Sequence, residues 1–106
     1  MKLTQKIKQE IEREFKDFCD KMYAGKTIDE RQELDQFFTP PAITIQVLES
    51  LTNSREDLAN MDILDPTCGS GNLLIACIIA GANPKRIFGN EFDPDIEQVC
   101  FDRLNT

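Results

Sequence analysis

The sequence contains no histidine, and its four cysteines include no pair with the spacing C-x-x-C. Zinc sites and most other transition-metal sites are built from clusters of these two residue types, so no metal site is expected. The cysteines lie at positions 19, 68, 77 and 100. Cys77 and Cys100 fall on predicted apolar helix faces, where free cysteine usually serves as a small core residue. Unpaired cysteines are typical of a reducing compartment, and we expect a cytoplasmic protein.

Long apolar runs and basic charge are also scarce. No segment is apolar for long enough to span a bilayer and no signal peptide is recognised, so no membrane association is expected. The 106 residues carry 12 basic and 19 acidic side chains, which gives a net charge of −7. Residues 39–106 hold four of the basic side chains and ten of the acidic ones. Because no basic stripe is present to neutralise phosphates, a free-standing nucleic-acid binder is disfavoured.

The length allows at most one small domain, which we divide into residues 1–36 and residues 37–106. Residues 4–24 are predicted to form one amphipathic helix that stops at Gly25, followed by a polar connector with a short helical turn. Its apolar face holds Ile7, Ile11, Phe15, Phe18, Cys19 and Met22, and its solvated face holds Lys6, Lys8, Glu10, Glu12, Arg13, Glu14, Lys16 and Asp17. Such a helix can cover the end of the domain formed by residues 37–106 or dock on another protein. We favour covering, because one apolar stripe needs only one partner.

Residues 37–106 are predicted to alternate between helices and strands. A first helix has Thr39 as its N-cap and Pro40 as its first residue, and a polar link with a helical turn follows it. A strand at 61–64 precedes a helix at 73–80 that is apolar on every side and therefore buried. A second strand at 87–92 leads into a last helix capped by Asp93. Strand, helix, strand and helix in this order predict an α/β protein with parallel strands.

The stretch from 65 to 72, Asp-Pro-Thr-Cys-Gly-Ser-Gly-Asn, joins the first strand to the buried helix. Gly69 and Gly71 allow the main chain to pass close to a ligand where a Cβ would collide. The third glycine of a dinucleotide-binding turn is replaced by Leu74, which argues against NAD. Asp65 would repel phosphates but accept hydrogen bonds from an ammonium group, and S-adenosylmethionine offers one. A Gly-x-Gly turn can also be purely structural.

A second acidic residue follows the second strand. Glu91 lies twenty residues after Gly71, where a carboxylate in this architecture accepts hydrogen bonds from both ribose hydroxyls. Phe92 beside it offers a flat apolar face to an adenine ring. The alternative is that Glu91 is a solvated strand end and that Phe92 belongs to the core.

Three motifs in order resemble those of S-adenosylmethionine-dependent DNA adenine-N6 methyltransferases, in the branch that includes type I restriction–modification subunits. Asp-Pro-Thr-Cys-Gly-Ser-Gly-Asn-Leu-Leu resembles motif I, Gly-Asn-Glu-Phe-Asp-Pro resembles motif II, and Phe-Phe-Thr-Pro-Pro at 37–41 resembles motif X. The resemblance implies part of a Rossmann-like methyltransferase fold, a helix and then β-α-β-α, truncated before the third strand. It implies S-adenosylmethionine as cofactor and a bacterial or phage-infected cell as the setting. The implied cofactor contacts are Phe38, Thr39, Pro40, Asp65, Pro66, Thr67, Cys68, Gly69, Gly71, Asn72, Glu91 and Phe92.

The catalytic motif of this family, Asn/Asp/Ser-Pro-Pro-aromatic, has no convincing match. Thr39-Pro40-Pro41-Ala42 imitates it, but Ala42 cannot stack on a flipped base, and we expect no catalytic residue in this chain. DNA is thus the substrate of a complete enzyme, while this chain alone binds DNA weakly or not at all. Two parallel strands leave both outer edges bare, so a second chain or self-association is expected to cover them. Two other functions stay open: a non-catalytic relative that binds cofactor or a methyltransferase partner, and a segment that methylates another acceptor.

Overall fold

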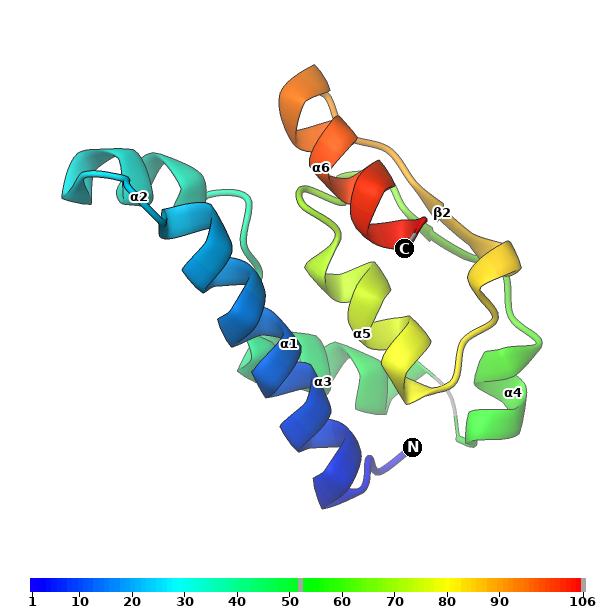
Figure 1. The fold of residues 1–106 in the computed structure, drawn as a ribbon. Coiled ribbons are helices and arrows are strands. Elements are labelled where there is room, and N and C mark those ends of the chain that lie inside the picture. Colours follow the sequence, from blue (N-terminus) through cyan, green and yellow to red (C-terminus); the bar gives the residue numbers. More distant parts are fainter. Residues whose placement is uncertain (52, 106) are drawn as a thin grey trace.

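The structure is a computed structural model, and it describes residues 1–51 and 53–105. Within these residues the protein is a mixed α/β protein with a small parallel sheet, as predicted (Figure 1). The elements in chain order are α1 (Gln5–Tyr23), α2 (Ile28–Asp35), α3 (Pro41–Leu51), α4 (Arg55–Ala59), β1 (Ile63–Asp65), α5 (Asn72–Ala80), the 3-10 turn η1 (Pro84–Arg86), β2 (Ile87–Gly89) and α6 (Pro94–Leu104).

The strands β1 and β2 are parallel, and α5 connects them. Their register pairs Ile63 with Ile87, Leu64 with Phe88 and Asp65 with Gly89. Pairing continues one residue further, because the amide of Asn90 donates to the carbonyl of Asp65 at 3.0 Å. The predicted second strand at 87–92 is too long: it ends at Gly89, and Glu91 and Phe92 belong to the loop before α6.

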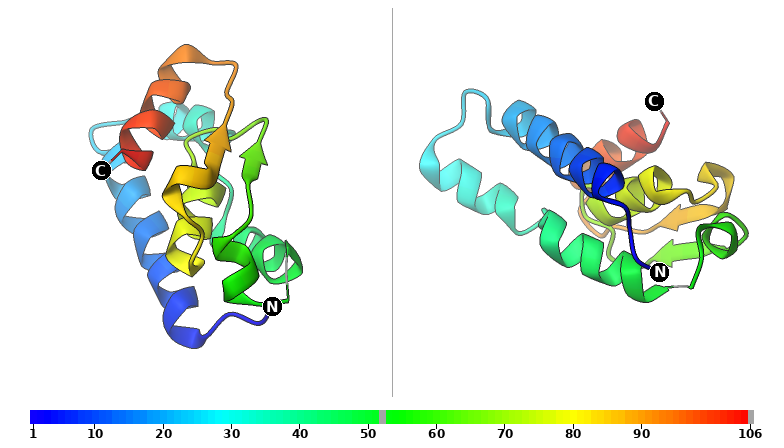
Figure 2. Two further views of the ribbon diagram at one scale, coloured as in Figure 1. Left: turned by 90° about the vertical axis from the view of Figure 1, so that its right-hand side faces the viewer. Right: turned by 90° about the horizontal axis from the view of Figure 1, so that it is seen from below.

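Helix α5 forms the centre of the molecule. It lies between α1 and the two strands, and α3 packs against both α1 and α5 (Figures 1 and 2). Leu74 on α5, Leu48 on α3 and Leu58 on α4 are completely buried. The prediction that α5 is buried all round is only partly correct, since several of its side chains, Leu73, Ile75, Ile78 and Ile79, are half-buried.

The N-terminal helix α1 covers the helical layer of the same core. Its N-cap Thr4 accepts a hydrogen bond from the amide of Ile7, and Ile7, Ile11, Phe18 and Cys19 are buried. Leu3, Ile7 and Ile11 pack in one apolar cluster with residues of α3, α4 and α5. Of the two roles considered for this helix, its contacts agree with covering the other helices of the chain. Its polar face is not solvated throughout, because Glu14 is half-buried and forms an ion pair with Arg103 of α6, 2.7 Å apart.

Two helix boundaries differ from the predictions. Residues 28–35 form a complete helix rather than a single turn, because Thr27 and Glu30 make a reciprocal capping box that satisfies two otherwise unpaired amides. Helix α3 begins at Pro41, and the carbonyl of Pro40 accepts hydrogen bonds from the amides of Ile43 and Thr44 at 3.1 Å. Pro40 is therefore the N-cap residue and Thr39 stands just ahead of it. Proline at the first helical position costs no hydrogen bond, so the one-residue shift preserves the physical argument.

Among the residues that the structure describes, no helix is both long and apolar enough to cross a membrane.

Candidate functional site

The turn between β1 and α5 has the geometry that glycine alone adopts easily. Gly69 has a φ of 57° and Gly71 a φ of 90°, both in the left-handed region. The amide of Gly71 donates to the carbonyl of Cys68 at 2.9 Å, and the amide of Cys68 donates to the carbonyl of Asn90 at 2.9 Å. The turn is therefore tied to the end of β2, where the second predicted acidic residue follows.

Both glycines are also required by the packing of the chain against itself. A Cβ on Gly69 would lie 2.8 Å from the carbonyl oxygen of Phe37, and a Cβ on Gly71 would lie 2.8 Å from Sγ of Cys100. The expectation from sequence is that the missing Cβ atoms leave room for a ligand. The structure gives a different reason, because protein atoms already occupy the space beside both glycines.

The segment at 37–40 meets this turn although it lies far away in the sequence. The carbonyl of Phe37 accepts two hydrogen bonds from Ser70, one from the amide at 3.4 Å and one from the hydroxyl at 3.1 Å. The structure thus brings the segment that resembles motif X against the one that resembles motif I. The Phe38 ring is buried against Phe18 and Tyr23 of α1, with ring centroids 5.3 and 5.8 Å away.

The two predicted carboxylates are half-buried at the ends of the strands. One oxygen of Glu91 accepts from the amide of Gly69 at 3.1 Å, and the other accepts from the amide of Asp93 at 2.9 Å. The carboxylate of Asp65 accepts from the amide of Thr67 at 3.1 Å. Glu91 is therefore not a solvated strand end. It links the glycine turn to the loop before α6, and two oxygens with about four acceptor positions can each take a further donor.

Phe92 is fully exposed, with a relative accessibility of 101%. The alternative that places it in the core is wrong. A large apolar ring that contacts water on every side contributes nothing to the stability of the chain. Its position directly after Glu91 leaves the ring free to cover a ligand held by that carboxylate.

In the side-chain amide of Asn72, the first residue of α5, the oxygen accepts a hydrogen bond but the nitrogen does not donate one within the part of the chain that the structure describes. Its Oδ1 accepts a hydrogen bond from Nη1 of Arg103 at 2.6 Å, which fixes which end of the amide faces the cation. Its Nδ2 is buried and has no partner among the described residues. A buried donor without an acceptor costs about 1 to 3 kcal/mol, so a ligand oxygen at this position would be stabilised.

Arg103 is a neighbour of this turn that the sequence did not reveal. Its side chain, 12% exposed, also donates to the carbonyl of Ser70 at 2.9 Å and to Glu14 at 2.7 Å, and its guanidinium lies 3.6 Å from the centre of the Phe18 ring. One side chain on α6 therefore joins the glycine turn to α1. The local sequence does not indicate such a role, because an arginine in the last turn of a helix is ordinarily explained by its interaction with the helix dipole.

Comparisons with known proteins agree with this arrangement. A family model described as N-6 DNA Methylase matches residues 17–105. The Type II methyltransferase M.VspI of Vibrio sp. (strain 343) is 31% identical over 68 residues, which are 64% of this chain and 16% of that protein. No solved structure matches. The family model and this relative together identify a segment related to N-6 DNA methyltransferases. The chain belongs to the N-6 DNA methylase family.

Proposed function

We propose that this chain is the S-adenosylmethionine-binding part of a DNA adenine-N6 methyltransferase and forms the first half of a Rossmann-like domain. The observation that carries the proposal is the buried, unpartnered Nδ2 of Asn72 in a turn where three separate segments of the chain meet. Membership of the N-6 DNA methylase family supports both the cofactor and the acceptor.

The residues present fit the chemical groups of this cofactor. The Glu91 carboxylate would accept hydrogen bonds from ribose hydroxyls, the exposed Phe92 ring would cover the adenine, and Asp65 would accept from the ammonium group. Asn72 and the hydroxyl of Thr39 would donate to the carboxylate end. The cofactor supplies a methyl group on a positively charged sulfur, which a nucleophilic nitrogen can accept. The remaining predicted contacts are Phe38, Pro40, Pro66, Thr67, Cys68, Gly69 and Gly71.

Methyl transfer to adenine requires groups that hold the target amine and stack on the extruded base. Ala42 cannot supply the aromatic ring, so we assign those groups to further sequence or a partner chain. The matched stretch makes up only 16% of the Vibrio relative, which leaves ample room for them in a protein of that kind. The role of this chain is then to bind and orient the methyl donor.

Replacing Phe92 with alanine separates ligand binding from stability. Because the ring is fully exposed, the thermal midpoint is expected to stay unchanged, while affinity for S-adenosylmethionine falls by about 0.5 to 1.5 kcal/mol, or roughly two- to tenfold. Isothermal titration calorimetry measures this change. Phe101→Ala serves as the matched control, because it removes a different exposed ring, one that lies on α6. This variant should bind S-adenosylmethionine as the original chain does. Equal affinities in all three proteins would contradict the role given to Phe92.

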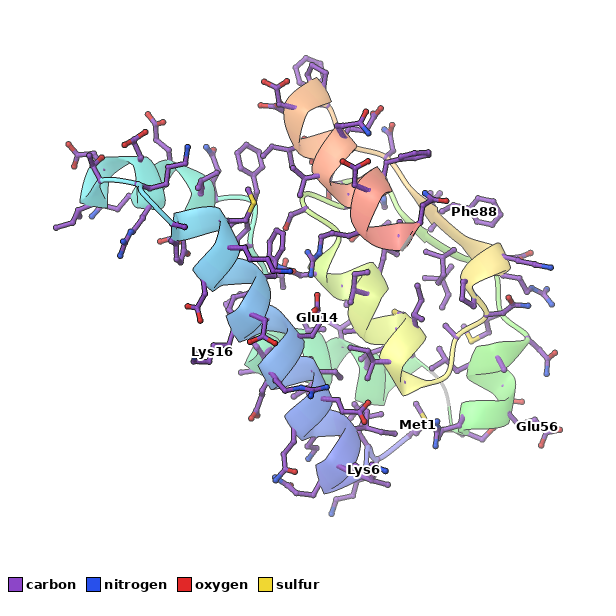
Figure 3. The ribbon with its side chains drawn as sticks, viewed as in Figure 1. Met1, Lys6, Glu14, Lys16, Glu56 and Phe88 are labelled. Carbon is purple, nitrogen blue, oxygen red and sulfur yellow. The ribbon has the colours of Figure 1, made fainter. Side chains whose placement is uncertain are left out.

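The outer face of the sheet supports a proposal about partners. Leu64 and Phe88 are direct neighbours across the two strands and are 64% and 52% exposed, and Phe88 projects away from the helices (Figure 3). Neighbouring exposed apolar side chains often mark a surface that contacts another protein. We infer that this face is covered by protein, and in the isolated chain by a second copy of itself.

Light scattering tests this inference. The isolated chain should have a native mass above that of a monomer, and the double variant Leu64→Thr/Phe88→Thr should shift it toward the monomer, because threonine keeps strand propensity and removes the apolar face. Ile28→Thr removes an even more exposed apolar side chain from α2 and should leave the mass unchanged. A monomeric original chain would contradict the inference.

A further inference from the structure

Two cysteine thiols lie side by side at the base of an open cleft. The cleft, about 510 Å³ in volume, runs between β2 and α6 and is lined in part by Gln98, Phe101 and the two cysteines Cys68 and Cys100. The Sγ atoms of these cysteines are 3.5 Å apart. Cys68 belongs to the glycine turn and Cys100 to α6, so the contact joins two elements that carry the proposed site.

The surroundings favour the protonated thiols at neutral pH. Burial, together with the hydrogen bond to Cys100, raises the pKa of the Cys68 thiol to about 12. Burial also raises the pKa of Cys100. Since the thiolate is the nucleophile in disulfide exchange, the raised pKa values make the pair react slowly at neutral pH. A disulfide bond is about 2.05 Å long, so the two sulfurs must approach each other by about 1.5 Å to form one.

We propose that Cys68 and Cys100 are a modification site that forms a reversible intramolecular disulfide by exchange with a small disulfide that enters this cleft. The thiolate of one cysteine attacks the small disulfide, which releases one thiolate and leaves a mixed disulfide. The other cysteine then attacks the protein sulfur of that mixed disulfide and releases the second thiolate. The protons of the two cysteines pass to the two released thiolates, so the protein loses two hydrogens and the small disulfide is reduced.

The consequence of this bond follows from the packing around the two sulfurs. A Cβ on Gly71 would be 2.8 Å from Sγ of Cys100, and a Cβ on Gly89 would be 3.0 Å from Sγ of Cys68. The turn and β2 therefore rest directly on these atoms. Shortening the distance between the sulfurs pulls the turn and α6 together, and we expect weaker S-adenosylmethionine binding in the oxidised chain. That consequence rests on the proposed function, whereas formation of the bond does not.

Oxidised glutathione is the probe for the test. After incubation with it, trypsin should yield residues 56–85 and 87–103 as one cross-linked species that dithiothreitol separates, detected by mass spectrometry. Cys77 also lies in the first peptide, so the experiment is repeated with Cys77→Ser, in which the cross-link should persist. The initial rate should rise with pH above neutrality, because burial raises the pKa of both thiols and the thiolate is the attacking form.

Several outcomes would overturn the proposal. These are four free thiols after prolonged incubation, glutathione retained on a single cysteine, or a cross-link that disappears in Cys77→Ser. Cys100→Ala and Cys68→Ala should each abolish the cross-link, and circular dichroism of both variants shows whether they are folded. If the cross-link forms but calorimetry finds the cofactor affinity unchanged, the modification site stands and its link to the proposed function fails. If neither form binds the cofactor, the proposed function fails while the site remains.

Discussion

Replacing Gly69 with alanine is expected to destabilise the chain by about 2 to 4 kcal/mol and to abolish measurable cofactor binding. A left-handed φ of 57° already costs an alanine about 1 to 2 kcal/mol. The new Cβ would also lie 2.8 Å from the carbonyl oxygen of Phe37, a backbone atom that cannot rotate away. Relieving this clash separates the turn from the segment at 37–40 and breaks the hydrogen bonds from Ser70. Urea unfolding and calorimetry measure the two effects.

Gly25 provides the control, since it has a similar φ of 73° but no heavy atom within 4 Å of the position that a Cβ would take. Gly25→Ala should therefore show the backbone strain alone, about 1 to 2 kcal/mol, and keep its affinity for the cofactor. The difference between the two variants isolates the close approach of the turn to Phe37. Equal losses of stability would show that this contact does not matter.

Replacing Arg103 with methionine is expected to cost about 2 to 3 kcal/mol of stability. Methionine keeps much of the apolar stem but leaves the Ser70 carbonyl and Asn72 Oδ1 without their donor. Glu14 also loses its partner, although its own side chain is 38% exposed and water offsets part of that loss. Because Asn72 and Ser70 belong to the turn, weaker cofactor binding should accompany the lost stability.

Arg86→Met removes an arginine whose ion pair with Asp62, at 2.9 Å, is nearly as short but exposed, with side chains 39% and 68% accessible. This substitution should lower the free energy of unfolding by less than about 1 kcal/mol. Urea unfolding of both variants compares an arginine side chain that is 12% exposed with one that is 39% exposed. If Arg103→Met is no more destabilising than Arg86→Met, the bonds from Arg103 do not hold the turn in place.

The features that sequence predicts well are those determined by neighbouring residues. The helix at 4–24 follows from its apolar period and from Gly25 after its end, and α1 spans Gln5–Tyr23. The parallel strands that precede and follow the glycine turn and α5 are likewise predicted by local sequence patterns. The match to the N-6 DNA Methylase model confirms the family that motifs I, II and X indicate.

The features that sequence does not predict depend on contacts between distant residues. The role of Arg103 needs Ser70, Asn72 and Glu14 to come together through three helices, and nothing near position 103 indicates it. The reason for glycine at 69 and 71 is similar. The sequence predicts that a Cβ would collide at both positions, but only the fold shows the positive φ and the atoms of Phe37 and Cys100 in the adjoining space. Helix α2 is longer than its polar composition suggests, because its capping box stabilises the first turn.

The most direct measurement is a titration of the 15N-labelled chain with S-adenosylmethionine, followed by the backbone amide signals in NMR spectra. We expect the signals of Gly69, Gly71, Asn72, Glu91 and Phe92 to shift together along one saturable curve, while those of Gly25 and Gly81 stay in place. Unchanged signals throughout the first group at saturating concentration, or shifts confined to other parts of the chain, would contradict this expectation.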